Sequence, residues 1–171
     1  RLQHPGIVPV YEAGRWPSGE PFFAMKLVEG TSLDKVIAET TTLGARLALL
    51  PTIIQIAEAM AYAHSQHVIH RDLKPQNVLV GAFGETVVVD WGLAKDLRTG
   101  AAADKPSRRG LSEDELQAPA SQNITMAGAI MGTPAFMPPE QAAGSPVDER
   151  ADVYALGAIL YHLLAGASPY G

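Results

Sequence analysis

The stretch that decides the fold reads HRDLKPQN at residues 70–77, and the short stretch DWG follows it at residues 90–92. Between them lie two runs rich in β-branched residues, 78–80 and 86–89, separated by the turn sequence GAFG at residues 81–84. A glycine-containing turn between two such runs predicts a β-hairpin. Because a hairpin brings its two ends together, the polar side chains just before and just after it are expected to converge.

Four side chains at the mouth of this hairpin carry the candidate chemistry: Asp72, Lys74, Asn77 and Asp90. Carboxylate and amide oxygens are ligands that suit Mg²⁺, and this ion completes its shell with water and phosphate oxygens. Asp72 can accept a proton from a hydroxyl nucleophile, and Lys74 can neutralise charge on a phosphoryl group during its transfer. The alternative for each lone Asp or Asn is a turn former.

Composition and charge limit the class of protein. The chain has 171 residues, 47% of them hydrophobic and 18% charged, which is ordinary globular usage and enough for one domain. Its net charge of −5 argues against a nucleic-acid partner. The absence of cysteine excludes disulfides and thiolate metal sites and fits a reducing compartment.

The rest of the pattern predicts a mostly helical lobe with small β elements. Residues 7–12 and 21–28 are typical of two strands joined by a turn. A helical stretch is expected from about residue 31 to 66, in which Pro51 is either the first residue of a helix or a kink. Residues 97–123 lose apolar periodicity, and a stretch of this length is usually functional or disordered.

Residues 153–171 contain no formal charge and require a choice between a membrane span and a core helix. The helix expected over residues 152–165 is about 21 Å long, shorter than the roughly 30 Å of membrane hydrocarbon. Asp152 also suits a helix N-terminus, where a carboxylate can accept hydrogen bonds from unpaired N–H groups. We therefore expect a buried core helix and no membrane segment.

The motifs, taken together, resemble those of protein kinases. Residues 70–77 are similar to the catalytic loop H-R-D-x-x-x-x-N, and residues 90–92 to D-F-G with Trp91 in place of Phe. Four further stretches resemble kinase motifs in the same order along the chain: HPGIV at 4–8, the loop after the small-lobe helix; MKLVEG at 25–30, the hinge; GTPAFMPPE at 132–140, the segment ending in A-P-E; and DVYALG at 152–157, the buried large-lobe helix. The ordered set is similar to bacterial serine/threonine kinases of the eukaryotic-like type.

The resemblance implies a role for each residue at the hairpin mouth. Asp72 would be the catalytic base, and Lys74 would contact the transferred phosphate, as in kinases that act on serine and threonine. Asn77 and Asp90 would hold Mg²⁺. His70 is interpreted as a packed core histidine rather than a proton carrier.

The resemblance also implies a nucleotide site at the hinge. The Lys26 carbonyl and the Val28 N–H would bond the adenine edge, Met25 would be the gatekeeper, and Leu79 would form the floor under the adenine. Lys26 also imitates the small-lobe lysine of V-A-I-K, but the hinge-like sequence VEG follows it at once, so we reject that role.

Substrate binding and regulation fall to four further residues by the same resemblance. Thr133 would line the substrate pocket, and Glu140 would tie the activation segment to an arginine further along. Arg71 either only faces solvent or, as we favour, binds a phosphate on the activation segment. Thr125 lies eight residues before Thr133, in a region where such kinases are often phosphorylated. Asp152 would bond backbone groups of the catalytic loop.

The fold class implied is α+β, a protein-kinase-like fold with a mostly helical large lobe and the last strands of the small lobe. Residues 1–30 would be the end of the small lobe and the hinge, and residues 31–171 part of the large lobe, with an activation segment at about 90–140. The Gly-rich loop, the small-lobe lysine and its helix glutamate cannot be placed. We therefore expect an incomplete kinase domain, inactive by itself, from a longer protein.

The function implied is ATP-dependent phosphorylation of serine and threonine hydroxyls of proteins, with ATP and Mg²⁺, in the cytoplasm. Any membrane anchor would lie outside these residues. One alternative is a pseudokinase that scaffolds or regulates, against which the intact Asp72, Asn77 and Asp90 argue. Another is a small-molecule phosphotransferase, against which Thr133 and the Glu140 end of the activation segment argue.

Overall fold

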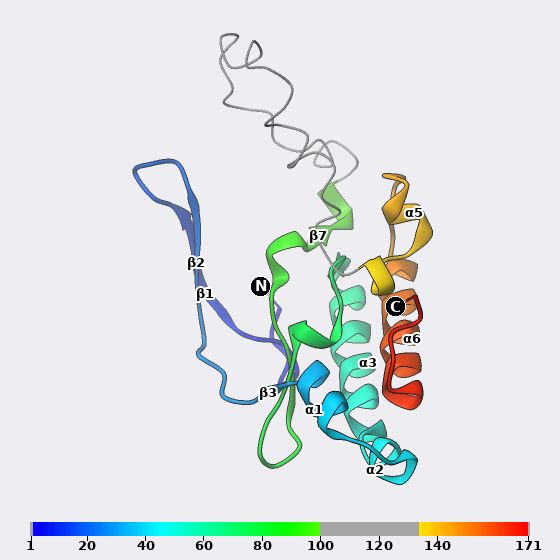
Figure 1. Ribbon diagram of the computed structural model, residues 1–171. Coiled ribbons are helices and arrows are strands. Elements are labelled where there is room, and N and C mark those ends of the chain that lie inside the picture. Colours follow the sequence, from blue (N-terminus) through cyan, green and yellow to red (C-terminus); the bar gives the residue numbers. More distant parts are fainter. Residues whose placement is uncertain (1, 100–133, 171) are drawn as a thin grey trace, which may run out of the picture.

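The computed structural model describes residues 2–99 and 134–170 (Figure 1). Helices and strands are mixed, so the α+β fold class is confirmed. The helices are α1 (Leu33–Glu39), α2 (Leu43–Leu47), α3 (Leu50–Ser65), α5 (Pro139–Ala142) and α6 (Arg150–Ala165), with short 3-10 turns η1 (Pro75–Asn77), η2 (Trp91–Leu93), η3 (Leu97–Thr99) and η6 (Pro134–Phe136). The strands are β1 (Val10–Arg15), β2 (Pro21–Met25), β3 (Thr31–Ser32), β4 (Val68–Ile69), β5 (Val78–Val80), β6 (Thr86–Val88) and β7 (Lys95–Asp96).

The hairpin predicted around residues 81–84 is present. β5 and β6 pair antiparallel, with Val78 opposite Val88, and β3 adds to the other side of β5. Gly84 in the turn has φ 81°, a left-handed conformation that glycine adopts without steric cost. The hairpin thus joins the 70–77 loop to Asp90 over a short path.

The two N-terminal strands are shifted from the predicted boundaries. β1 begins at Val10 because Ile7 and Val8, each 3% exposed, lie against β6 instead. The Val8 N–H donates to the Val88 carbonyl at 3.1 Å, and the Val88 N–H donates to the Gly6 carbonyl at 2.8 Å. β1 and β2 pair with each other and stand away from the helices (Figure 1).

The single helical stretch expected over residues 31–66 is wrong, because three helices occupy it. Thr40 ends α1 in an extended conformation, and the Thr42 hydroxyl caps α2 by accepting the Ala45 N–H at 3.2 Å. Pro51 stands in the first turn of α3, where its missing N–H has no helical partner to lose, so it does not kink the helix.

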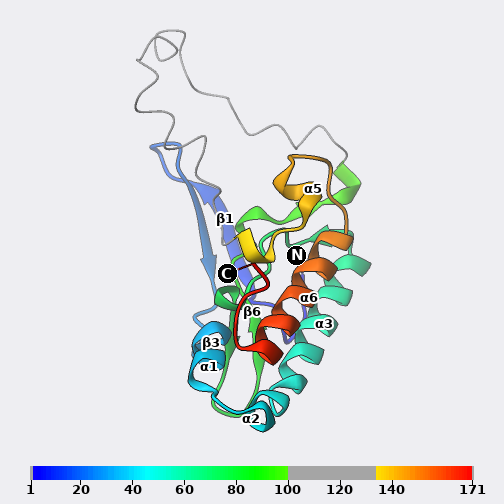
Figure 2. The ribbon, with the colours of Figure 1, turned by 45° about the vertical axis from the view of Figure 1, so that its right-hand side comes forward.

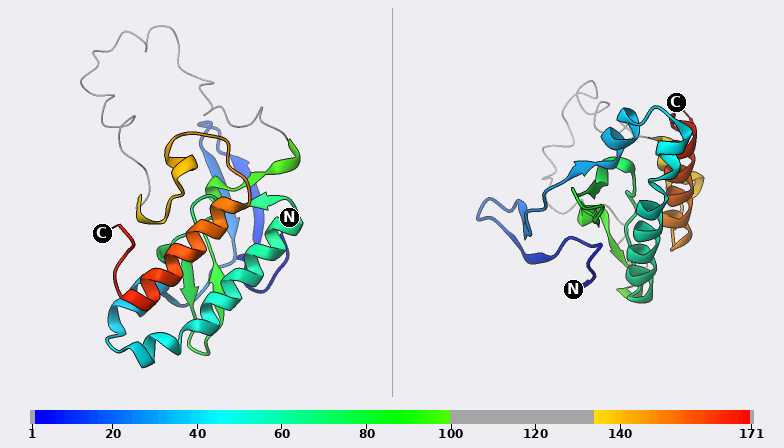
Figure 3. Two further views of the ribbon diagram at one scale, coloured as in Figure 1. Left: turned by 90° about the vertical axis from the view of Figure 1, so that its right-hand side faces the viewer. Right: turned by 90° about the horizontal axis from the view of Figure 1, so that it is seen from below.

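The core lies between α1, α3, α6 and the β5–β6 hairpin. α3 and α6 pack side by side (Figures 2 and 3). Side chains that are fully buried on these elements include Leu33, Ile56, Val78, Val88, Ile159 and Leu163. The expectation of a buried core helix near the C-terminal end is therefore confirmed, with α6 beginning at Arg150, two residues earlier than predicted.

One described stretch, Leu43–Ser65, is long and apolar enough to cross a membrane by length and composition alone. The core helix of a soluble protein passes the same test, and α3 contributes Ile56, Ala59 and Ala63 to the core. This stretch does not establish a membrane segment in either direction.

Candidate active site

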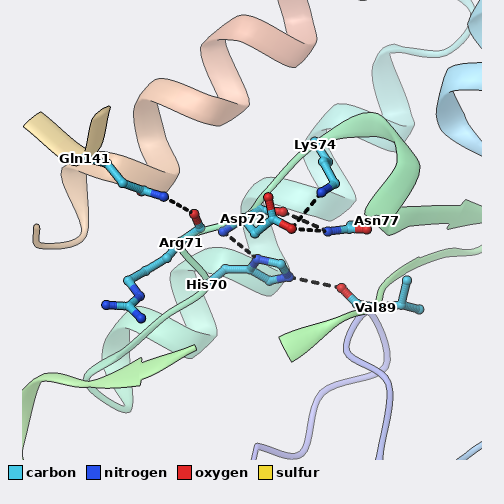
Figure 4. A network of polar contacts seen from close by, with 7 residues as sticks. All are labelled: His70, Arg71, Asp72, Lys74, Asn77, Val89 and Gln141. Atoms are coloured by element: carbon cyan, nitrogen blue, oxygen red, sulfur yellow. Dashed lines mark hydrogen bonds and ion pairs between the residues drawn. The ribbon is translucent and has the colours of Figure 1, made fainter. Parts of the chain in front are cut away.

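Three of the predicted catalytic side chains meet in the loop of residues 70–77, which joins β4 to β5. Lys74 Nζ lies 2.7 Å from Asp72 Oδ2, and Asn77 Nδ2 donates to the same oxygen at 3.2 Å and to the Asp72 carbonyl at 2.9 Å (Figure 4). The Lys74 and Asp72 side chains are 19% and 18% exposed. The Asp72 carboxylate is therefore held in one orientation at a site that still reaches solvent.

The β5–β6 hairpin places the backbone of Asp90 beside the 70–77 loop. The Val89 N–H donates to the Asn77 carbonyl at 2.9 Å, so Asp90 follows directly on a residue bonded to the loop. Asp90 adopts a left-handed backbone conformation, with φ 61°, and begins η2. Asp and Asn tolerate this region better than most side chains do, so an aspartate suits the sharp change in chain direction here.

His70 is a buried structural residue, as predicted. Its side chain is fully buried, and burial lowers the pKa of His70, which keeps the ring neutral. The Asp72 N–H donates to Nδ1 at 3.3 Å, so Nε2 carries the proton and donates to the Val89 carbonyl at 3.1 Å. The Trp91 ring packs against it in an edge-to-face arrangement with 4.7 Å between the ring centroids, which supports a packing role for Trp91.

Asp152 anchors the 70–77 loop from α6. The side chain is 1% exposed; Oδ2 accepts the His70 N–H at 2.8 Å, and Oδ1 accepts the Arg71 N–H at 2.9 Å. His64 Nε2 on α3 lies 2.8 Å from Oδ2. The helix N-cap is Glu149, so Asp152 uses its carboxylate on the loop rather than on its own helix end. The contact of His64 with Asp152 was not predicted from the sequence.

Hydrogen bonds hold Arg71 through its backbone N–H, its carbonyl and its side chain. Its backbone is left-handed, with φ 67°, a conformation that costs a non-glycine residue about 1–3 kcal/mol. Its Nε donates to the Leu93 carbonyl at 2.7 Å, and its carbonyl accepts from Gln141 Nε2 on α5, also at 2.7 Å. Gln141 was also missed; the only signal for it in the sequence is its place directly after Glu140.

The residues predicted to bind adenine lie on and beside β2. Met25 ends this strand and is 45% exposed. The Lys26 N–H donates to the Pro9 carbonyl at 2.9 Å, and Val28 is half-buried in the segment that follows. Leu79 is half-buried in β5, opposite Ser32 of β3. Within the described residues no hydrogen bond joins this group to Asp72, Asn77 or Asp90.

The regulatory and substrate residues are placed only in part. Thr125 and Thr133 lie outside the described residues. Glu140 is in α5, and no ion pair of its carboxylate with another described residue is present. Gln141, which follows Glu140 in α5, donates to the Arg71 carbonyl.

Oxygen donors of the kind that Mg²⁺ prefers are present at the hairpin mouth. Because Asn77 Nδ2 faces Asp72, the amide oxygen of Asn77 points to the other side of its side chain, and Asp90 offers a carboxylate. No group of three His, Cys, Asp or Glu side chains among the described residues is placed to hold a metal alone. Two protein oxygens completed by water and phosphate oxygens are the arrangement that Mg²⁺ commonly takes with nucleotides.

Comparisons with known proteins agree with this geometry. The model of the protein kinase domain matches residues 1–171. A serine/threonine-protein kinase PknD of Protochlamydia amoebophila is 39% identical over 181 residues, which covers 99% of this chain and 18% of the relative. PknD proteins of Chlamydia muridarum and Chlamydia trachomatis serovar L2b are 38% and 40% identical, with 99% of this chain and 19% of each relative covered.

The chain thus spans about a fifth of the length of the relatives that it matches. The likeness nevertheless runs through the whole chain. The chain belongs to the protein kinase family.

Proposed function

We propose that this chain is the part of a serine/threonine protein kinase that supplies the catalytic base and the Mg²⁺ ligands. The observation that carries the proposal is the Asp72 carboxylate, fixed by Lys74 at 2.7 Å and by Asn77 at 3.2 Å on a loop anchored by a buried aspartate. Membership of the kinase family and the names of its relatives support the reaction class. The reaction would take place in the cytoplasm, where ATP is available.

The proposed step is transfer of the γ-phosphoryl group of ATP to a serine or threonine hydroxyl. The hydroxyl oxygen forms a bond to the γ-phosphorus, and the bond from that phosphorus to the oxygen bridging to the β-phosphate breaks, with its electron pair leaving on ADP. The hydroxyl proton goes to the Asp72 carboxylate. Lys74 contacts the transferred group, and Asn77 and Asp90 would hold Mg²⁺, which would neutralise phosphate charge.

The proposal assigns the adenine to the segment after β2. The Lys26 carbonyl and the Val28 N–H would bond its edge, with Met25 beside it and Leu79 beneath it. Support comes from the pairing of β3 with β5, which carries the chain from Val28 to a position alongside Leu79.

Regulation is assigned to Arg71, Thr125, Thr133 and Glu140. A phosphate on Thr125 adds a charge of about −1.5 to −2 and would pair with Arg71, which adjoins the catalytic base. Thr133 would contact the substrate, and Glu140 would anchor the end of the segment to an arginine. Phosphate mapping by mass spectrometry after incubation with ATP tests this part, and an active enzyme with an unmodified Thr125 would contradict it.

We also propose that these 171 residues are inactive by themselves. The chain contains no G-x-G-x-x-G sequence to cover the triphosphate. Positioning and charge stabilisation of the phosphates carry most of the catalysis of phosphoryl transfer. The purified 171-residue chain should therefore show no steady turnover of ATP.

The deciding experiment uses the full-length gene product and its Asp72→Asn variant. Loss of the proton acceptor should lower kcat about 10²-fold or more. The isosteric amide keeps the fold, which circular dichroism should show unchanged. A wild type that binds ATP without turnover would favour the pseudokinase alternative, and an Asp72→Asn variant with wild-type turnover would refute the assignment of the base.

A further inference from the structure

The peptide group between Arg71 and Asp72 is held at both ends by side chains. Its carbonyl oxygen accepts from Gln141 Nε2 at 2.7 Å, and its N–H donates to His70 Nδ1 at 3.3 Å (Figure 4). A peptide group is planar, so two bonds at its opposite ends fix the orientation of the whole plane. This plane sets the direction in which the chain enters Asp72.

The conformation needs such support because Arg71 is left-handed, with φ 67°. Left-handed backbone is unfavourable for a side chain with a Cβ and persists only where its surroundings hold it. Asp152 holds the N–H of Arg71 at 2.9 Å, and Gln141 holds its carbonyl. With the Gln141 bond lost, Arg71 would relax toward ordinary backbone angles and turn the Asp72 side chain away from its present orientation.

The side-chain amide of Gln141 donates a hydrogen bond through Nε2 and leaves its oxygen atom, Oε1, without one among the described residues. This oxygen is buried. Reversing the amide would place this oxygen against the Arg71 carbonyl, and two acceptors repel each other. The chemistry of the contact therefore specifies a donor at this position.

Gln141 reaches the loop from a segment far from it in the chain. It belongs to α5, and residues Ala135 and Phe136 just before α5 are each 4% exposed and pack in the core. The bond from Gln141 to Arg71 spans 70 positions in the sequence. The bond therefore connects α5 directly to the peptide that precedes Asp72.

We propose that Gln141 is a positioning residue, which holds the Arg71–Asp72 peptide plane and couples the position of α5 to the orientation of the catalytic base. The inference rests on the proposed function of Asp72. Gln141 acts through Arg71 and touches no reacting atom.

The test compares Gln141→Met and Gln141→Glu in the full-length gene product. Methionine keeps the length of the side chain without the donor, and glutamate places a carboxylate against the Arg71 carbonyl. Because misplacement of a catalytic group by about 1 Å can cost about 10²-fold in rate, we expect Gln141→Met to lower kcat about 10-fold and Gln141→Glu to lower it further. The KM values for ATP and protein substrate should stay within about twofold, since substrate contacts are retained.

Gln55→Met is the matched control. Gln55 also bonds backbone through its amide, to the Gly84 carbonyl at 3.3 Å and from the Thr86 N–H at 3.0 Å, but on the far side of the hairpin from the 70–77 loop. We expect Gln55→Met and Gln141→Met to lose a similar amount of stability, because each loses hydrogen bonds to the backbone. Gln55→Met should nevertheless keep the wild-type kcat. Equal kcat losses in Gln55→Met and Gln141→Met would show that destabilisation alone explains the effect and would overturn the proposal.

Hydrogen exchange gives a second readout that needs no activity. The amides of residues 70–72 should exchange faster in Gln141→Met than in wild type or Gln55→Met, because their bonds to Asp152 and His70 depend on the held conformation. Unchanged exchange there, or a wild-type kcat in Gln141→Met, would overturn the proposal. A wild type without kinase activity would refute the proposed function instead, and exchange would still decide whether Gln141 holds the loop.

Discussion

The 70–77 loop and the β1–β2 hairpin are both short segments outside the α-helices, yet they are stabilised in different ways. In the loop, His70 is fully buried, Leu73 is 2% exposed, and the backbone is bonded by side chains from α5 and α6. In the hairpin, Phe23 is 54% exposed and Leu27, just after it, 89% exposed. The two strands of the hairpin are bonded chiefly to each other.

The two segments differ in whether buried polar side chains hold their backbone in place. Asp152, which anchors the loop from α6, is a polar side chain removed from water, which is costly unless its hydrogen bonds are satisfied. Such groups fix one geometry, and here that geometry is the orientation of Asp72. The hairpin keeps its shape by local pairing and has little influence on the loop, so substitutions in the two segments should differ in their effect on stability.

The largest effect is expected from Asp152→Ala. It removes the acceptor of the His70 and Arg71 N–H groups, and a buried donor without a partner costs about 1–3 kcal/mol. We expect the free energy of unfolding to fall by about 3 kcal/mol, measured by urea denaturation. Asp148→Ala, in the turn before the same helix, is the control. It breaks a solvent-exposed ion pair with Arg150 and the hydrogen bond from the Arg150 N–H to the same carboxylate, and a loss above about 1 kcal/mol there would contradict the comparison.

The second effect is a pH dependence of stability that comes from His70. Its folded-state pKa lies below the ordinary value of 6.5 because the ring is buried, so below pH 6.5 the unfolded state binds a proton that the folded state does not. Stability should thus be constant above about pH 7 and fall as the pH is lowered through 6.5, by at most about 1.4 kcal/mol per pH unit for one histidine.

His70→Gln should reduce this slope, and denaturation curves between pH 5 and 8 measure it. Burial also lowers the pKa of His162, which is partly exposed, so His162→Gln should reduce the slope by less. His67→Gln, at an exposed histidine, controls for the loss of an imidazole. A slope unchanged by His70→Gln would show that this ring is not the buried neutral group described above.

How much of this could be predicted from the sequence depends on how local each feature is. The β5–β6 hairpin and the meeting of Asp72 with Asn77 follow from a short turn and a fixed spacing, and both are present. The bond from Gln141 joins residues 70 positions apart and depends on how α5 packs, which no local pattern records. The breaks between α1, α2 and α3 were missed, although the threonine run before Gly44 interrupts the apolar pattern between α1 and α2.

A smaller effect is expected from alanine substitutions at two glycines that have similar backbone conformations. Gly84 in the β5–β6 turn has φ 81° and Gly19 in the β1–β2 turn has φ 88°, and a Cβ at either meets no atom within 4 Å. Alanine should therefore add similar local strain at both, about 1 kcal/mol. Only Gly84→Ala should lower the global free energy of unfolding by this amount, because the β5–β6 hairpin is part of the core.

Gly19→Ala should instead increase local opening of its own hairpin. Hydrogen exchange at β1 and β2 would rise, while the urea midpoint for the whole domain stays within the error of the wild type. Equal shifts of the midpoint in Gly19→Ala and Gly84→Ala would show that the two hairpins unfold as one cooperative unit and would break the comparison.

The smallest effect on stability is expected from Leu27→Ser and Phe23→Ser. Because both side chains are already exposed, their replacement should change the free energy of unfolding by no more than about 0.5 kcal/mol. Exposed apolar surface promotes association, so these variants of the 171-residue chain should aggregate more slowly, as measured by light scattering. Phe136→Ser, at a phenylalanine that is 4% exposed, is the matched control and should be destabilised by about 3 kcal/mol or more. A loss of comparable size in Phe23→Ser would mean that the β1–β2 hairpin packs on the lobe in solution, and the contrast between the two segments would then be wrong.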